Sequence, residues 1–204
     1  MKLVAVSAGL STPSSTRLLA DRLASSVHGA LVAHGHEVEI HVIELRELAV
    51  AIANNLVTGF PPPQLAAAID TVTAASGLIT VTPVFTASYS GLFKSFFDLI
   101  DPEALSGKPV LIAATGGTAR HSLVLEHALR PLFAYLRATV VPTAVYAASE
   151  DWGSGGDAYT GGLPARMERA GAELAVLMAA RPADEVPEDD VTVLERQLSD
   201  LRFD

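Results

Sequence analysis

Short apolar runs alternate along the chain with longer segments in which apolar residues recur at helical spacing. The short runs are typical of strands buried on both faces, and the longer segments are typical of helices that pack on a sheet. Strands are predicted at residues 3–8, 38–43, 77–82, 110–114 and 140–146. Helices are predicted at residues 16–34, 64–75, 90–100, 121–137 and 164–181. This alternation indicates an α/β fold with a parallel sheet flanked by helices.

Composition and length favour one globular domain. The chain has 204 residues, of which 50% are hydrophobic and 18% are charged, so it can bury a sizeable core. We expect the domain to cover residues 1–181, with a polar, glycine-rich loop at 153–162. Residues 182–204 read as an acidic tail, in which residues 191–201 have a short amphipathic helical pattern.

Charge and composition exclude several functional classes. The formal net charge of −9 disfavours nucleic acid as a partner, because like charges repel. The absence of cysteine excludes disulfides, thiolate metal sites and a cysteine nucleophile, and it fits a reducing compartment, so we expect a cytoplasmic protein. No apolar run is long enough for a membrane span or a signal peptide, so no membrane partner is expected.

The sequence also contains no motif for metal binding or for hydrolase chemistry. His34, His36 and His41 lack the helix-face spacing with a carboxylate that a metal site needs, so no metal is expected. The charged segment at residues 37–47 is expected to be a solvated strand and turn. The sequence has no GxSxG element, so a hydrolase triad has no support.

Ligands of open parallel sheets bind at the carboxyl ends of the strands, where three loops of this chain should meet. The first loop is rich in hydroxyls and precedes a helix that Ser15 or Thr16 is expected to cap. Such hydroxyls and helix-end amides can hold a phosphate, and Arg17 adds a positive charge nearby. A simple N-cap in a serine-rich loop is the alternative, since the loop is neither GxGxxG nor GxxxxGKS.

The second loop carries the most informative stretch, which reads TPVFTASYSGLFKSFFDLID. Pro83 removes a backbone donor where the strand is expected to end, and Phe85 and Tyr89 offer aromatic surface. A helix that begins near Ser90 would add unpaired N–H groups. The combination suits a planar, electron-rich or anionic ligand, although an ordinary strand-to-helix turn is the alternative.

The third loop, ATGGTARHS, again lies between a strand and a helix. Gly116 and Gly117 let the backbone approach a ligand closely. Exposed amides there can bind the polar edge of a heterocycle. The three loops together are therefore similar to the FMN site of a flavodoxin-like protein.

A more specific resemblance runs from about residue 3 to residue 146 and is strongest from 82 to 133. This region, with its TPV, SG and ATGGT strings, resembles the NADPH-dependent FMN reductases that supply reduced flavin to two-component monooxygenases, especially those of alkanesulfonate systems. The resemblance implies a flavodoxin-like three-layer sandwich with a five-stranded parallel sheet in the order 2-1-3-4-5. It also implies NADPH-dependent reduction of FMN, a flavin-dependent monooxygenase as partner, and no catalytic side chain.

The resemblance further implies three groups of FMN-binding residues. Ser14, Ser15 and Thr16 would surround the FMN phosphate, with Ser7 near the same loop. The flavin ring would face Pro83, Val84 and Phe85, in a loop closed by Ser88, Tyr89 and Ser90, and its pyrimidine edge would be bound by Thr115, Gly116, Gly117 and Thr118. The first loop departs from the family pattern, in which an arginine comes earlier in the loop, because the nearest arginine here is Arg17. Arg120 is an addition that either meets the NADPH 2′-phosphate or covers the surface.

Two features bear on assembly and on the alternatives. The resemblance places His127 in a π-bulge at a tetramer contact. The helix at residues 90–100 carries more apolar side chains than one contact with a sheet should hide, so we expect a homodimer or a homotetramer. A quinone or azo reductase that retains FMN, and a flavodoxin-type electron carrier without pyridine-nucleotide activity, remain open as alternatives.

Overall fold

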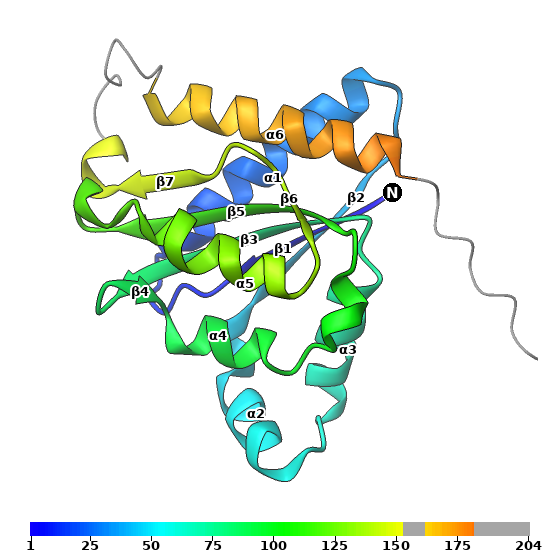
Figure 1. Cartoon of the computed structure of the whole chain (residues 1–204), viewed down its shortest axis with the longest axis vertical. Coiled ribbons are helices and arrows are strands. Elements are labelled where there is room, and N and C mark those ends of the chain that lie inside the picture. The colour runs from blue at the N-terminus through cyan, green and yellow to red at the C-terminus, as the bar shows by residue number, and fades with distance from the viewer. Residues whose placement is uncertain (153–161, 182–204) are drawn as a thin grey trace, which may run out of the picture.

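The computed structural model of the protein describes residues 1–152 and 162–181 (Figure 1). All but the last residue of the expected loop at 153–162, and the whole of the expected tail at 182–204, lie outside the described residues. The strands are β1 (Lys2–Ser7), β2 (Glu39–Glu44), β3 (Gly77–Phe85), β4 (Ser88–Tyr89), β5 (Pro109–Gly116), β6 (Thr139–Val140) and β7 (Val145–Ala148). The α-helices are α1 (Ser15–Ala33), α2 (Leu45–Thr58), α3 (Pro63–Thr73), α4 (Gly91–Phe97), α5 (Arg130–Tyr135) and α6 (Gly162–Ala180). Shorter helical segments are η1 (Pro102–Leu105), η2 (Ala119–His121), η3 (Leu125–Leu129) and η4 (Ser149–Trp152).

The strands form one sheet with a parallel core. Its order is β2-β1-β3-β5-β6, β7 also pairs in parallel with β5, and β4 pairs antiparallel with β3. Numbered as the five expected strands, this is the order 2-1-3-4-5 of flavodoxin-like sheets. The predicted fold class is therefore confirmed, although the sheet has seven strands rather than five.

Helices cover both faces of the sheet, which produces the predicted three layers. Helices α1 and α6 lie on one face, and α2, α3, α4 and α5 lie on the other (Figure 1). Neighbouring residues of β1 alternate between the two cores: Val4 and Val6 pack under α2 to α5, whereas Leu3 and Ala5 pack under α1 and α6. Burial on both faces explains why the central strands read as almost continuous apolar runs.

Helix α2 was not predicted. The sequence interpretation ended in a solvated turn at residues 37–47, but the chain enters a helix at Leu45. Leu45, Leu48 and Ile52 share one buried face at helical spacing, and this face packs into the core. The helix was missed because its apolar periodicity begins inside the charged segment at residues 37–47.

The second loop differs from its expected form. The parallel ladder between β3 and β5 ends at Pro83, which lies opposite Thr115, as expected, but the strand itself does not end there and continues to Phe85. Val84 and Phe85 then pair antiparallel with β4, so the aromatic loop is the tip of a short hairpin. A proline removes only its own N–H from a ladder, and here the residues after it find a new partner strand.

The last expected strand, at residues 140–146, is two short strands. Both β6 and β7 pair with β5, but they are separated by a segment that includes Pro142. Because proline cannot donate to the ladder, the pairing is interrupted there and resumes at Val145.

Helix α4 begins as expected after Ser90, whose hydroxyl accepts a hydrogen bond from the N–H of Phe93. It ends at Phe97, earlier than predicted. Phe93, Phe96 and Phe97 are at most 1% exposed, and Phe97 lies 5.0 Å from the ring of Phe133 in α5. The expectation that this helix has much apolar surface to spare is therefore not met, because its phenylalanines are buried within the chain itself.

The helix expected at residues 121–137 is interrupted. It consists of the turn η2, the π-helical segment η3 and the α-helix α5. His127 lies in η3 and is exposed, so the predicted π-helical geometry at this residue is confirmed. Arg130 donates to both carboxylate oxygens of Glu126, at 2.6 and 2.9 Å, and this hydrogen bonding lowers the pKa of Glu126.

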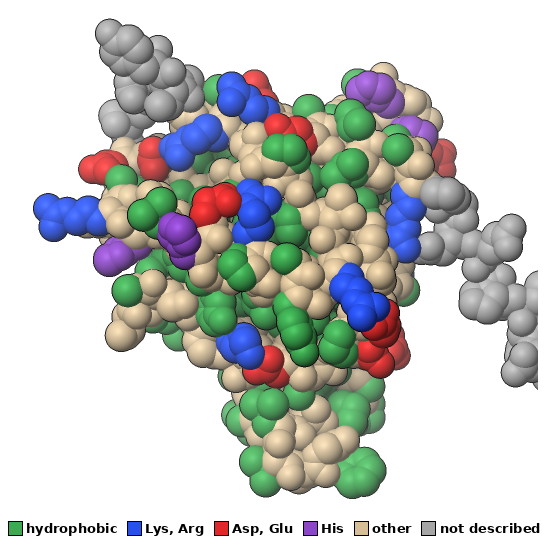
Figure 2. All heavy atoms as spheres, viewed as in Figure 1, with side chains coloured by type: hydrophobic (Ala, Val, Ile, Leu, Met, Phe, Trp, Pro, Cys, Tyr) green, Lys and Arg blue, Asp and Glu red, His purple; other side chains and the backbone are tan. Residues whose placement is uncertain are grey.

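One end of the molecule is apolar and uncharged. Val57 and Phe60, at and after the end of α2, are 88% and 82% exposed. The chain has no charged residue from 48 to 69, and Figure 2 shows no charged side chain over the lower end of the molecule. This end differs from the rest of that face, where charged groups are interspersed.

Candidate functional site

A pocket of about 440 Å³ opens at the carboxyl ends of the central strands. Its volume falls within the range of about 300–1,000 Å³ that is usual for small-molecule sites. The predicted residues that line it are Ser14, Ser15, Thr16, Pro83, Val84, Phe85, Thr115, Gly116 and Gly117. Leu10, Ser11, Ser149 and Trp152 complete the lining. The three predicted loops therefore do meet at one site.

The first loop presents the amino end of α1. Ser14 caps this helix, since its hydroxyl accepts from the N–H of Arg17 at 3.2 Å, which corrects the expected cap at Ser15 or Thr16. The other first-turn N–H groups have no acceptor within the helix and can bind an anion. A Cβ on Gly9 would lie 2.0 Å from the Ser14 hydroxyl oxygen, so only glycine leaves room for the cap.

Arg17, the expected cation near the phosphate, is already paired. Its guanidinium donates to Asp21 at 2.8 Å and to Glu44 at 2.6 Å. The hydrogen bond with Asp21, followed by the charges of both carboxylates, raises the pKa of Arg17. An anion in the pocket would thus meet hydroxyls and backbone N–H groups before it met this charge.

Arg46 supports the first loop from outside the pocket. It reaches from α2 to the carbonyl of Ser11, at 3.2 Å, and to the hydroxyl of Thr12. Its guanidinium also lies 3.1 Å from Glu44. No sequence pattern signals this role, because Arg46 lies in a helix that was not predicted and contacts residues more than thirty positions earlier in the chain.

The second loop contributes a partly open wall. Pro83 and Val84 are half-buried, and the ring of Phe85 is 47% exposed at the hairpin. Ser88 and Tyr89 form β4 and do not line the pocket. Ser90 is buried, and its N–H donates to the hydroxyl of Thr82 at 3.0 Å. Ser90 therefore caps α4 and does not line the pocket.

The third loop joins the first through two buried hydroxyls. The Oγ1 atoms of Thr16 and Thr115 are 2.8 Å apart. A Cβ on Gly116 would lie 2.0 Å from the hydroxyl oxygen of Tyr146, so this glycine is required by packing. A Cβ on Gly117 would meet nothing within 4 Å, which leaves its backbone open to the pocket.

Tyr146 fixes the far side of the third loop. Its hydroxyl donates to the carbonyl of Thr118 at 2.8 Å, and its own carbonyl accepts from Arg166 at 3.0 Å. Burial, and then the charge of Asp151, raises the pKa of Tyr146, so the phenol keeps its proton and remains a donor. Thr118 itself does not line the pocket, but this bond positions its backbone.

The fourth side of the pocket was missed by the sequence interpretation. Ser149 and Trp152 line it from η4, which directly follows β7. A signal did exist, because β7 is parallel to β5 and its carboxyl end must open at the same edge of the sheet. Composition gives a second signal, because Trp152 is the only tryptophan in the sequence.

Two other residues that the sequence analysis singled out lie outside the pocket. Ser7, at the end of β1, is 1% exposed, and its hydroxyl has no hydrogen-bond partner within the described ranges. Arg120 lies in η2 and is exposed. No cluster of three or more potential metal ligands exists in residues 1–152 and 162–181, and no helix in those ranges is long and apolar enough to cross a membrane.

The lining accordingly combines hydroxyls, backbone amides and two aromatic rings. Hydroxyls and helix-end N–H groups suit a phosphate at the first loop. Open backbone at Gly117 and the rings of Phe85 and Trp152 suit a flat heterocycle. Groups of these kinds are suited to binding and orienting a ligand, which is what FMN requires of a protein whose chemistry is carried by the flavin.

Comparison with known proteins agrees with this chemistry. The sequence profile described as NADPH-dependent FMN reductase matches residues 1–153. An FMN reductase (NADPH) from Pseudomonas aeruginosa is 42% identical over 151 residues, which cover 74% of this chain and 78% of the relative. An NADH-dependent FMN reductase, SfnF, from Pseudomonas fluorescens is 41% identical over 152 residues, covering 74% and 79%.

Solved structures with a similar fold include an oxidoreductase and a flavodoxin-like protein. An oxidoreductase from Corynebacterium diphtheriae superposes with a TM-score of 0.84 at 47% identity, covering 89% of this chain and 98% of that one. A flavodoxin, WrbA-like protein from Agrobacterium tumefaciens shares the fold, with a TM-score of 0.54 at 17% identity over 87% of this chain and 94% of that one. The chain is therefore an oxidoreductase that belongs to the NADPH-dependent FMN reductase family.

Proposed function

We propose that this protein uses NADPH to reduce FMN and releases the reduced flavin to a flavin-dependent monooxygenase. The proposal rests on one observation: the loops after β1, β3 and β5 together form one wall of a pocket, in a chain of the FMN reductase family. Release is favoured because the site is lined on one side by exposed loop residues such as Phe85 and Gly117.

The chain's own residues would bind and orient the reactants. Ser14, Ser15 and Thr16 would hold the FMN phosphate with hydroxyls and with the amino end of α1. The ring would lie along Pro83 to Phe85, with its pyrimidine edge on the backbone of the third loop. When bound, FMN accepts a hydride from the nicotinamide, so proximity and orientation are what the protein supplies.

We propose NADPH rather than NADH as the preferred donor. The proposal is supported by the family description and by the P. aeruginosa relative, whereas the P. fluorescens relative is named for NADH. Arg120 is an exposed cation that could meet a 2′-phosphate, with a surface role as the alternative. The ratio of kcat/KM for the two nucleotides, in wild type and in Arg120→Ala, separates these roles.

Nucleotide oxidation with and without added flavin tests the function. Flavin-free protein should oxidise NADPH only when free FMN is supplied, because a flavin donor must let its product leave. Sustained NADPH oxidation with a quinone or an azo dye, by protein that keeps its FMN, would support the retained-flavin alternative. FMN binding without any NADPH turnover would indicate an electron carrier, and either result would overturn the proposal.

We also propose that the protein works in the cytoplasm as a homodimer or a homotetramer. The cysteine-free composition suits a reducing compartment. Assembly is supported less by α4 than by the uncharged end around Val57 and Phe60, since two copies that each carry a net charge of −9 approach best through an uncharged surface. Sedimentation of Phe60→Glu should show smaller particles than wild type, whereas a monomeric wild type at micromolar concentration would contradict assembly.

A further inference from the structure

Trp152 occupies a fixed position at the edge of the pocket. It is the last residue of η4, and Asp151, which precedes it in the same segment, accepts hydrogen bonds from the N–H of Ala148 at 2.7 Å and from Arg166 at 2.9 Å. The indole also packs against the apolar core beneath α1 and α6. One side chain thus lines the pocket while it is anchored to the body of the domain.

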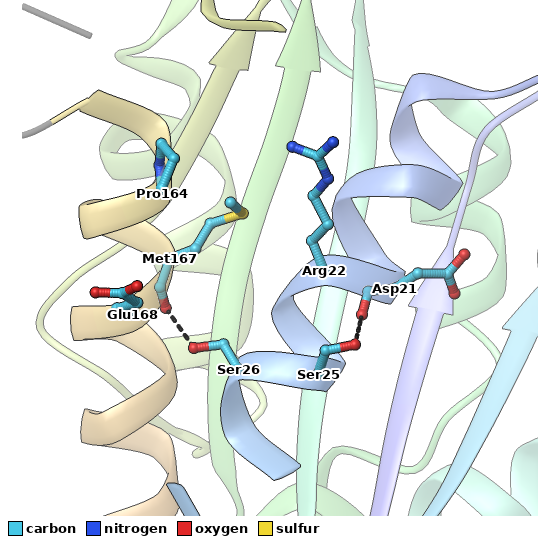
Figure 3. A pocket seen from close by; sticks show the side chains of 7 residues that line it. All are labelled: Asp21, Arg22, Ser25, Ser26, Pro164, Met167 and Glu168. Atoms are coloured by element: carbon cyan, nitrogen blue, oxygen red, sulfur yellow. Dashed lines mark hydrogen bonds between the residues drawn. The ribbon is translucent and has the colours of Figure 1, made fainter. Parts of the chain in front are cut away.

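Arg22 covers a face of this indole. Its guanidinium carbon lies 5.1 Å from the centre of the Trp152 ring, which is a cation–π distance. Figure 3 shows Arg22 extending from α1 into a groove of about 440 Å³ between α1 and α6, while its neighbour Asp21 points away. Across residues 1–152 and 162–181, no carboxylate lies within 4.0 Å of the Arg22 guanidinium, so the indole is the partner that holds it.

These contacts give the two residues different tasks. Trp152 has a large flat surface at a pocket that suits a flat heterocycle, and aromatic stacking on a base contributes about 1–3 kcal/mol. Arg22 restricts the rotation of the indole, because a turned ring would lose the cation–π contact. A ring that is oriented before the ligand arrives binds more tightly, since less conformational freedom is lost on binding.

We propose that Trp152 contacts the flavin in the bound state and that Arg22 is its positioning residue, so that the pair sets how long FMN stays bound. This inference rests on the proposed function, because it assigns FMN to the same pocket. The nicotinamide still needs an open face of the flavin, so the pair should change FMN affinity and release rather than the rate of reduction at saturation.

The single tryptophan gives a direct test in the unaltered protein. FMN is titrated while indole emission is followed, and bound FMN is measured independently by ultrafiltration. Quenching of the emission in proportion to bound FMN is expected. FMN that binds by ultrafiltration while the indole emission stays unchanged would overturn the inference and leave the proposed function intact. Absence of FMN binding by ultrafiltration would overturn both.

Variants then separate contact from positioning. Trp152→Ala should raise the Kd and the dissociation rate of FMN about tenfold, as loss of one stacking contact implies. Trp152→Phe should recover most of the affinity. Unchanged FMN dissociation in both variants would overturn the proposal.

Arg22→Ala should weaken FMN binding about threefold and shift the indole emission, while Arg22→Lys should restore both, because either cation can lie over the ring. Arg169→Ala is the matched control, since it removes the same charge from an exposed position on α6 that lines neither cavity. Equal effects of Arg22→Ala and Arg169→Ala on FMN affinity would show that net charge alone is responsible and would overturn the role of Arg22.

Discussion

Two walls of the same pocket are built in different ways. The strand-end wall consists of Leu10, Ser11, Ser14, Ser15, Thr16, Pro83, Val84, Phe85, Thr115, Gly116 and Gly117, and the η4 wall consists of Ser149 and Trp152. The strand-end wall is positioned by paired parallel strands, whose register fixes where each loop begins. The η4 wall depends on the single carboxylate of Asp151 and on the cation of Arg22. Disturbing the first should therefore abolish binding, whereas disturbing the second should adjust it.

The largest effect is expected in the strand-end wall at Gly116. In Gly116→Val the added side chain would begin 2.0 Å from the Tyr146 hydroxyl oxygen, so the loop or the tyrosine must move. Overpacking of this kind costs about 1–3 kcal/mol of folding free energy, and we expect FMN affinity to fall more than tenfold. Flavin titration and urea unfolding measure the two effects.

Gly117→Val is the matched control for stability. Its side chain would enter open space, so the unfolding free energy should stay within about 0.5 kcal/mol of wild type. Its FMN affinity should still fall, because the backbone there is expected to touch the ligand. If Gly117→Val binds FMN as tightly as wild type, the third loop does not approach the ring at that residue.

A smaller loss is expected when the cap of α1 is removed. Ser14→Ala deletes the acceptor for the Arg17 N–H and a hydroxyl of the proposed phosphate site. Loss of a helix cap costs about 1 kcal/mol of folding free energy, and FMN affinity should fall about fivefold. Ser15→Ala, which keeps the cap, should have nearly wild-type stability, and equal stability losses in the two variants would show that Ser14 is not the cap.

Loosening the anchor of the η4 wall, without removing Trp152 itself, should have a weaker effect still. Asp151→Asn keeps the size of the side chain but weakens the bonds to Arg166 and to the N–H of Ala148. With the ion pair partly exposed, a loss of about 1 kcal/mol of folding free energy is expected, together with a roughly threefold fall in FMN affinity. A loss of affinity as large as that of Gly116→Val would remove the distinction between the two walls.

The smallest effect concerns pH. The pKa of Tyr146 is raised by burial, so the folded state favours the protonated phenol. The associated stability is fully present below the ordinary tyrosine pKa of about 10 and is lost as pH rises through the higher folded value. Spectrophotometric titration should show one tyrosine ionising late, and Tyr146→Phe should remove that step. A titration of Tyr146→Phe identical to wild type would contradict this assignment.

The comparison of the two walls also explains what the sequence could predict. Buried strands are recognisable as apolar runs, and strand topology brings their loops together, so Ser14, Phe85 and Gly117 could be assigned to one site from the sequence alone. The carboxyl end of β7 indicated this edge of the sheet, but Trp152 itself was missed because its position depends on the bond between Asp151 and Arg166 and on the contact with Arg22 in α1, which no local pattern encodes.

Errors elsewhere have similar causes. Pro83 was expected to end its strand, yet antiparallel pairing with β4 carries β3 on to Phe85. Gly116 and Gly117 look alike in sequence, but only the first meets a side chain, that of Tyr146. The phenylalanines of α4 looked like surplus apolar surface because their partner Phe133 lies on a helix far along the chain.

A crystal structure of the FMN complex tests the central claim most directly. The account predicts the phosphate at Ser14 to Thr16 and the ring between residues 83–85 and 115–117, with Trp152 in contact with the flavin. FMN bound instead in the groove between α1 and α6, or a ring held away from the strand-end wall, would contradict it.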